Sequence, residues 1–444
     1  ALHWPQIDPD TRDTEDILMV DEPKTYAWIE DMITALRAAF RSSRIHIGMD
    51  EAWMLGLGNY RLRHGIEPAH KLMARHLEKV RDIARRHGFS PMIWSDMYLC
   101  AASPTGEYYN AVDPIPEEVV RSVCEGVSLV YWDYCHEDEQ DYDRMLRLHR
   151  QFGGETMFAG GLWTWIGPAP AQDKMRRASI PALRACEKNG VDTVVGTAWG
   201  DNGAECSLLA ALYGMQLYAE YNYTGATDTD WLDARFLACT GEPAAPFALM
   251  SQFNTPPGVV SRDENPVNVS KFLLYEDPLI PLYARDTQGM CFSGFYADLA
   301  ERFAAFRGQT PAFEKLYRFY EAFARLMAAK CRWRENLPAL CVETAGQGIA
   351  LAQDCRAEIA RCRLAWEALW EQVNKPFGYE IIDLRLSGLD GRYETTLRKL
   401  ERLRGGDTAV LALVREEKLR VLSDEEGRFY GIGAWSDCVS ACKI

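Results

Sequence analysis

Two neighbouring acids, Asp50 and Glu51, are the residues of this chain whose types and spacing most directly suggest catalysis. They close the segment 46–51 (HIGMDE), which continues a short apolar run. Adjacent carboxylates repel each other, so the pair is costly unless it is solvated, paired or used in chemistry. Consecutive residues of a strand point in different directions. The two acids are therefore poorly placed to face each other across one bond of a substrate, and better placed to serve two different atoms of one substrate.

The same pair has a structural explanation, because an Asp-Glu dipeptide at a strand end is usually a solvated loop entry or the first turn of a helix. Two features favour chemistry instead. Gly48 precedes the pair, and more acids and aromatic residues end similar apolar runs later in the chain. These residues are Trp94, Asp96, Trp132, Asp133, Tyr134, Trp163, Trp165, Trp199 and Asp201.

Short apolar runs alternate with helical patterns up to about residue 225. Strands are predicted at 44–51, 91–98, 127–135, 156–165 and 193–201, and helices at 71–87, 141–152 and 178–189. This alternation is typical of parallel βα units, and in a (β/α)8 barrel the carboxyl ends of the strands form the functional face. Because the acids and aromatic residues gather at these ends, we expect them to line a ligand cup.

The rest of the chain is predicted to be mainly α-helical, with helices at 313–331, 352–373 and 395–404. We therefore expect two domains: residues 1–225 form the catalytic barrel portion, and residues 226–444 form a helical C-terminal domain. No histidine follows His149 in the sequence, so the C-terminal domain is expected to be structural.

Composition narrows the range of partners. The chain has 444 residues and a net charge of −15, and it lacks the run of about 18 apolar residues that would span a membrane. The negative charge repels phosphate backbones and anionic lipids, so we expect neither nucleic acid nor a membrane as a partner. The thirteen cysteines include no CxxC pair, and no signal peptide precedes the first motif. Free thiols and a cytoplasmic location are therefore predicted.

The segment 46–60 (HIGMDEAWMLGLGNY) resembles the His-x-Gly-x-Asp-Glu signature of glycoside hydrolase family 20, the β-N-acetylhexosaminidases, and most of all their compact bacterial intracellular branch. Residues 199–201 (WGD) match the family's Trp-x-Glu/Asp position, and residues 374–389 (NKPFGYEIIDLRLSGL) are similar to that branch's helical tail. The resemblance implies a (β/α)8 TIM-type barrel that needs no cofactor or metal. It also implies substrate-assisted hydrolysis with retention, in which the 2-acetamido oxygen attacks the anomeric carbon and forms an oxazolinium ion.

The resemblance assigns roles to three acids. Asp50 would hold the acetamido N–H and stabilise the developing positive charge, and Glu51 would protonate the leaving oxygen and then deprotonate water. Asp201 would take the 4- and 6-hydroxyls, which makes the enzyme exo-acting. The alternative for Asp201 is the N-cap of a helix at 204–217.

Aromatic residues would bind the sugar. The acetamido pocket and the stacking face would be formed by Trp94, Trp163 or Trp165, and Trp199. Tyr134 is the candidate hydrogen-bond donor to the acetamido oxygen, and Trp132 shares its strand end.

Three further residues have competing explanations. His3 matches the family histidine that hydrogen-bonds the acid/base, and a surface histidine is the equal alternative. For His46, a position in the protein core is favoured over direct contact with the substrate. Asp96 either binds the substrate or caps the helix that follows it.

The chain departs from the family pattern in two places. Residues 162–168 (LWTWIGP) stand where the family has Trp-Tyr-x-Asp, which weakens the assignment of the tyrosine. Only about five and a half of the eight barrel strands are recognisable, and the arginine of the family's first strand is absent. We therefore expect an N-terminally incomplete barrel with unpaired strand edges.

The preferred interpretation is an exo-acting retaining β-N-acetylhexosaminidase that hydrolyses terminal β-linked GlcNAc or GalNAc. One alternative is a conventional two-carboxylate retaining glycosidase, with Glu51 and Asp201 as the pair. Another is a sugar-binding or inactive fragment, and a weaker one is a metal-dependent hydrolase through His46, Asp50 and Glu51, which insensitivity to chelators would exclude. The sequence leaves open the sugar configuration, the aglycone and a homodimer through the helical region.

A change of substrate separates the two enzymatic interpretations. Replacing the substrate's N-acetyl group by a hydroxyl removes the internal nucleophile, so the hexosaminidase interpretation predicts near-complete loss of turnover. A conventional glycosidase would tolerate the change. A chromogenic β-glycoside assay measures the difference, and tryptophan fluorescence titration with N-acetylglucosamine would reveal binding without turnover.

Overall fold

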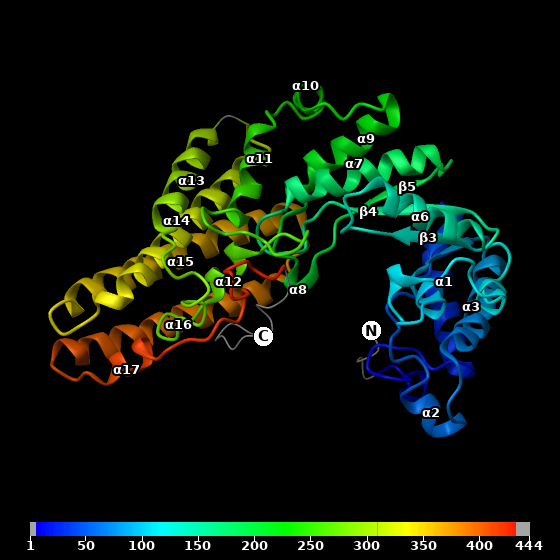
Figure 1. Cartoon of the computed structure of the whole chain (residues 1–444), viewed down its shortest axis with the longest axis horizontal. Helices are drawn as coiled ribbons and strands as arrows, with labels where there is room; N and C mark the ends of the chain where they lie inside the picture. The colour runs from blue at the N-terminus through cyan, green and yellow to red at the C-terminus, as the bar shows by residue number, and fades with distance from the viewer. Residues whose placement is uncertain (1–5, 309, 432–444) are drawn as a thin grey trace. The chain divides into compact units, whose positions relative to one another are not determined.

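The computed structural model describes residues 6–308 and 310–431 (Figure 1). It contains a five-stranded sheet in the order β1-β2-β3-β4-β5. The strands are β1 (Arg44–His46), β2 (Ser90–Trp94), β3 (Ser128–Trp132), β4 (Thr156–Gly161) and β5 (Val194–Thr197). The pairs from β1 to β4 are parallel. The α/β class predicted from the sequence is therefore confirmed, whereas the N-terminally incomplete (β/α)8 barrel stays a prediction.

The described chain divides into two compact units. The first contains residues 1–160 and 181–195, and the second contains residues 161–180 and 196–444. The division passes through the end of β4, through β5, and through α7 (Gln172–Lys188) at Pro181, which lies inside the helix. The sequence-based domain boundary at residue 225 is a different division and stays a prediction.

Helices of the first unit follow from local patterns. In α3 (Ala69–Arg86), Leu72, Leu77, Val80 and Ile83 recur at helical spacing and are buried. The helix ends where Gly88 adopts a φ of +74°. The other helices of this unit are α1 (Pro23–Ala39), α2 (Asn59–His64), α4 (Asp96–Ala101), α5 (Glu117–Val120) and α6 (Glu139–Arg150), with short 3-10 turns at Pro9–Thr11 and Tyr108–Asn110.

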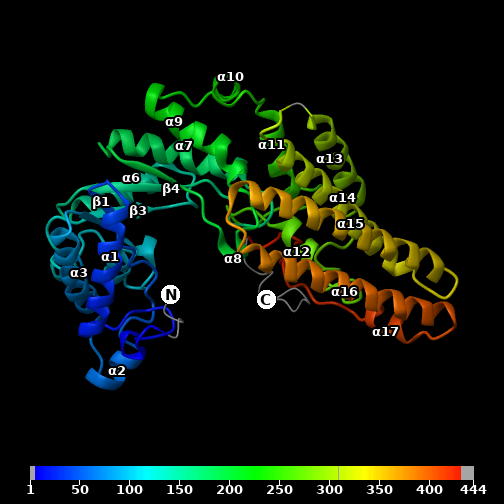
Figure 2. The same cartoon turned by 180° about the vertical axis from the view of Figure 1, so that it is seen from behind.

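The second unit is helical apart from the strand residues at the ends of β4 and β5. Its core is formed by the successive neighbours α13 (Ser293–Phe306), α14 (Glu314–Asn336), α15 (Ala345–Val373) and α16 (Tyr379–Arg404), which lie side by side (Figure 2). The remaining helices are α8 (Asp201–Ala204), α9 (Leu212–Thr224), α10 (Thr229–Thr240), α11 (Ala245–Ser251), α12 (Val269–Tyr275) and α17 (Ala409–Arg415), with 3-10 turns at Leu208–Ala211, Gln252–Asn254 and Leu337–Ala339.

Aromatic side chains fill the space between these helices. Phe323 of α14 stacks on Phe253 with ring centroids 4.8 Å apart, and Phe319 lies 4.8 Å from Trp366 of α15. All four side chains are buried. Such rings bury large apolar areas, so this core is the main source of stability for the helical unit.

Two further properties concern the described residues as a set. None of their helices is long and apolar enough to cross a membrane. Their cysteines are free thiols, and six of them are buried: Cys100, Cys186, Cys206, Cys331, Cys355 and Cys362.

A buried acid holds the loop that follows the Asp50-Glu51 pair. The side chain of Asp13 accepts hydrogen bonds from the backbone N–H groups of Gly56 at 2.6 Å and Tyr60 at 2.8 Å. A Cβ on Gly58 would lie 2.1 Å from the Asp13 carbonyl oxygen, so only glycine allows this close approach. Asp13 therefore fixes residues 56–60 against the start of the chain.

Replacing Asp13 by alanine should lower the free energy of unfolding by about 3 kcal/mol, because two hydrogen bonds to a buried carboxylate are lost. Urea denaturation followed by circular dichroism measures the change. The exposed helix-capping acid Asp138, which accepts from Gln140 N at 2.9 Å, is the control: alanine there should cost only about 1 kcal/mol. Equal losses in the two variants would contradict the assignment.

Candidate active site

The Asp50-Glu51 pair lies on a left-handed turn rather than on a strand. The predicted strand 44–51 was too long, because β1 ends at His46. Gly48, Met49 and Glu51 have φ values of +74°, +73° and +48°. For residues with a Cβ, this conformation costs about 1–2 kcal/mol each. Backbone strain of this kind persists only where the surroundings over-determine it, and it is frequent at active sites.

Both acids line one pocket. Its volume is about 250 Å³, and its walls include Ile47, Leu55 and Met73 beside Asp50 and Glu51. The two acids are exposed, in contrast to the apolar wall. The turn thus presents two carboxylates to the same solvent-accessible space, where a single small molecule can contact both.

Asp96 stabilises the turn through a hydrogen bond to its backbone. Its side chain is fully buried, and Oδ2 accepts a hydrogen bond from the Glu51 backbone N–H at 2.8 Å. The pKa of Asp96 is raised to about 6, mainly by burial and also by the charge of Asp50, although hydrogen bonds from the Glu51 N–H and the Trp132 side chain act to lower it. Asp96 was expected to bind substrate or cap a helix. Its bond to the Glu51 N–H gives Asp96 a role in positioning Glu51, and its contact with substrate stays a prediction.

His46 and Trp94 form a second support for the turn. Their ring centroids lie 4.3 Å apart, and His46 Nδ1 accepts a hydrogen bond from the Gly48 N–H at 3.1 Å. Burial lowers the pKa of His46, which favours the neutral imidazole that can accept this bond. The arrangement agrees with the expected core position of His46, so the histidine shapes the turn through its ring.

Trp132 and Tyr134 lie at the end of β3 in the same unit. Their rings stack with centroids 5.4 Å apart, and Trp132 packs with Trp94 on one small apolar cluster. The first unit therefore brings together seven of the expected site residues: His46, Asp50, Glu51, Trp94, Asp96, Trp132 and Tyr134. His3 lies outside the described residues.

Asp133 and His136 organise the Tyr134 loop; Asp133 is one of the acids expected to line the ligand cup, whereas His136 is not among the expected site residues. The buried Asp133 carboxylate accepts from Tyr131 Oη at 2.7 Å and Cys135 N at 3.1 Å, and it lies 2.7 Å from His136 Nδ1. An aspartate that accepts from the backbone two residues later is a common turn signal, so the WDYCH sequence held a clue to this loop.

The remaining expected residues belong to the second unit. Trp163 is fully buried and stacks on Trp165 with centroids 4.7 Å apart. Trp165 is the partly exposed member of the pair, so it is better placed than Trp163 to meet a sugar. Trp199 is 39% exposed, and its carbonyl accepts from Thr164 Oγ1 at 2.9 Å.

Asp201 is exposed at the start of α8. Partial burial of the carboxyl group raises the pKa of Asp201, and the positive charge of Lys271 opposes that rise. The expected helix at 204–217 begins only at Leu212, and Ser207 caps the preceding 3-10 turn. Asp201 is therefore not the N-cap of that helix, and its role in ligand binding stays a prediction.

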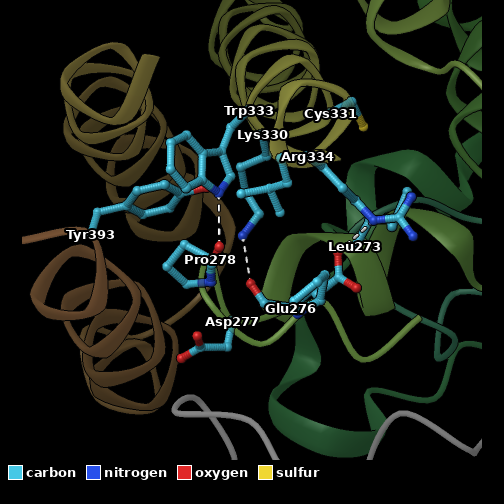
Figure 3. A pocket seen from close by; sticks show the side chains of 11 residues that line it. Leu273, Glu276, Asp277, Pro278, Lys330, Cys331, Trp333, Arg334 and Tyr393 are labelled. Atoms are coloured by element: carbon cyan, nitrogen blue, oxygen red, sulfur yellow. Dashed lines mark hydrogen bonds and ion pairs between the residues drawn. The ribbon is translucent and has the colours of Figure 1, made fainter. Parts of the chain in front are cut away.

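A second cavity, in the helical unit, is too small for a sugar. Its volume is about 10 Å³, enough for roughly one water molecule. Figure 3 shows its polar wall, where Lys330 Nζ donates to the Glu276 carbonyl at 2.9 Å and Trp333 Nε1 donates to the Pro278 carbonyl at 2.9 Å. These mutual bonds indicate a structural role. In the described part of the chain, no group of His, Cys, Asp or Glu could hold a metal ion.

Two family models match segments of the chain. The family model "Glycosyl hydrolase family 20, catalytic domain" matches residues 5–123, and "Glycoside Hydrolase 20C C-terminal domain" matches residues 245–430. The first match relates residues 5–123 to the catalytic domain of that family. Taken together, the two matches show that the chain belongs to glycoside hydrolase family 20.

A solved structure is also similar. It is the GH20 exo-β-N-acetylglucosaminidase from Vibrio harveyi in complex with N-acetylglucosamine, with 14% sequence identity and a TM-score of 0.29. The alignment covers 54% of this chain and 37% of the Vibrio chain. No curated relative matches the chain.

The raised pKa of Asp96 predicts how stability changes with pH. Because the folded pKa of about 6 exceeds the ordinary value of 3.8, the folded state loses stability as pH rises through this range. The loss should total about 3 kcal/mol between pH 4 and pH 7 and should be absent in Asp96→Asn. Urea denaturation at several pH values measures it, with Asp31→Asn on the exposed face of α1 as the control. Parallel stability curves for wild type and Asp96→Asn would contradict the assignment.

Proposed function

We propose that this chain carries the catalytic centre of an exo-acting retaining β-N-acetylhexosaminidase, which hydrolyses terminal β-linked N-acetylhexosamine by substrate assistance. The observation that carries the proposal is the left-handed turn on which Asp50 and Glu51 enter one pocket while Asp96 fixes the Glu51 backbone. Two acids on one turn can address the acetamido group and the glycosidic oxygen of one sugar. Membership of family 20 supports this division of labour.

The proposed reaction uses groups of the substrate and of this chain. Asp50 accepts the acetamido N–H, which orients the carbonyl oxygen toward the anomeric carbon and stabilises positive charge on the forming ring. Glu51 donates a proton to the leaving oxygen as the glycosidic bond breaks. It then removes a proton from the water that opens the oxazolinium ion, so two inversions give net retention. Tyr134 would donate to the acetamido oxygen.

Asp201 supports the exo-acting part of the proposal. Its carboxylate is exposed and is not used as a helix cap, so it can accept from the 4- and 6-hydroxyls of a terminal sugar. Trp165 and Trp199 offer exposed ring surface for the apolar sugar face. A cytoplasmic location belongs to the same proposal and is supported by the free thiols of the described cysteines.

Titration with an N-acetylglucosamine-derived thiazoline tests the role of Asp50, because the thiazoline ring mimics the oxazolinium ion. Asp50→Asn should weaken binding by roughly 100-fold, since a charge-assisted hydrogen bond is lost. Asp16 lines the same pocket, so Asp16→Asn is the matched control and should leave binding within about threefold. Equal weakening in both variants, or no thiazoline binding by the wild type, would refute the proposal.

Glu51→Gln tests the acid/base separately. Turnover of β-N-acetylglucosaminides with poor leaving groups should fall by roughly 100-fold or more, because they depend on protonation. Substrates with activated aryl leaving groups should lose less in their glycosylation step. Thiazoline binding by a wild type that shows no turnover would instead support a sugar-binding fragment.

A further inference from the structure

A strained segment follows Asp201 directly. Asn202, Gly203 and Ala204 have φ values of +55°, +104° and +50°. Three consecutive residues in this region are unusual, and alanine has neither the freedom of glycine nor the local hydrogen bonding of asparagine to favour it. Contacts from outside the segment must therefore hold this shape.

The contacts come from the C-terminal helices. Arg385 of α16 donates from Nη1 to the Asn202 carbonyl at 2.6 Å and to Glu205 Oε1 at 2.9 Å. A Cβ on Gly203 would lie 3.2 Å from the same nitrogen and 3.4 Å from Ile381, so α16 packs closely on the segment. Both Arg385 and Glu205 are buried.

Glu205 also connects to α12. Its Oε2 lies 2.8 Å from Lys271 Nζ, and Tyr275 Oη donates to Oε1 at 2.5 Å. Lys271 is 1% exposed, and its charge acts in turn on Asp201, where it opposes the rise in pKa. Residues of α12 and α16 thus meet at one carboxylate just after the exposed Asp201. Such a network is costly to break, because a buried charge would remain without its partner.

We propose that Arg385 is a positioning residue for sugar recognition. It acts through the Asn202 carbonyl and Glu205, and it fixes the backbone that presents Asp201 to the sugar's 4- and 6-hydroxyls. The C-terminal helical region is thereby part of the specificity apparatus and not only a structural appendage. This inference rests on the proposed function of Asp201 as a hydroxyl ligand.

The kinetic test compares Arg385→Gln with Arg356→Gln in the full chain. Arg356 of α15 forms an ion pair with Asp390 of α16 at 2.7 Å. Replacing Arg356 therefore removes an arginine bond to α16, the helix that carries Arg385, without touching the segment 201–205. The measured quantity is the ratio of kcat/KM for an aryl β-N-acetylglucosaminide to kcat/KM for its 6-deoxy analogue. Arg385→Gln should reduce this ratio by roughly tenfold, mainly by loss of turnover of the hydroxylated substrate, and Arg356→Gln should preserve it.

A double variant distinguishes positioning from general damage. If Arg385 acts through Asp201, Arg385→Gln added to Asp201→Asn should lower the ratio no further, because the two changes remove one interaction. Arg385→Lys keeps the charge but not the fork of donors, and it should give an intermediate ratio. An unchanged ratio in a folded Arg385→Gln protein would overturn the inference.

Amide hydrogen exchange provides a readout that does not depend on activity. Peptides that cover residues 197–208 should exchange roughly tenfold faster in Arg385→Gln than in the wild type, and at the wild-type rate in Arg356→Gln. If the wild type shows no turnover, the proposed function fails, whereas the positioning by Arg385 still stands or falls with this measurement. Unchanged exchange in Arg385→Gln would overturn the positioning role.

Discussion

The hydrogen bond from the Glu51 N–H to Asp96 is the interaction on which the site depends. It joins residues 45 positions apart, and it offsets part of the cost of a left-handed turn at Met49 and Glu51. Without it, the turn would relax toward extended backbone, and the two acids would point away from each other as on any strand. Burial of Asp96 makes the bond strong, because water cannot compete for the carboxylate.

The same device recurs along the chain. Buried or half-buried carboxylates accept from backbone N–H groups and so fix irregular segments between regular elements. Glu335 accepts from Phe292 N and Ser293 N, and Asp286 accepts from Val421 N and Leu422 N. Part of the chain's excess of acids is therefore structural. A neutral sugar carries no charge that either the structural acids or the remaining acids would repel.

Periodic segments were predictable because their information is local. The helix predicted at 71–87 is α3 (Ala69–Arg86), since its apolar spacing decides the fold without distant partners. Strand ends were predicted too late: the strand expected at 91–98 ends at Trp94, where α4 follows. The polar tails of these runs belong to turns, and the turns depend on distant acceptors such as Asp96. For the same reason, the sequence indicated the Asp50-Glu51 pair but not the backbone that orients it. Arg385 lies in the segment 374–389, whose pattern predicts a helix but does not mark Arg385 as a positioning residue.

The reactivity of the buried thiols reports local unfolding of the structure around them. Cys186 lies in the first unit, and Cys331, Cys355 and Cys362 lie in the second. Burial raises the pKa of each of these thiols, so alkylating reagents meet little thiolate until the surrounding helices separate. Exposed Cys239 and Cys291 would react first and set the reference rate. The order in which the protected positions become labelled would therefore show which of the two cores loosens at lower cost.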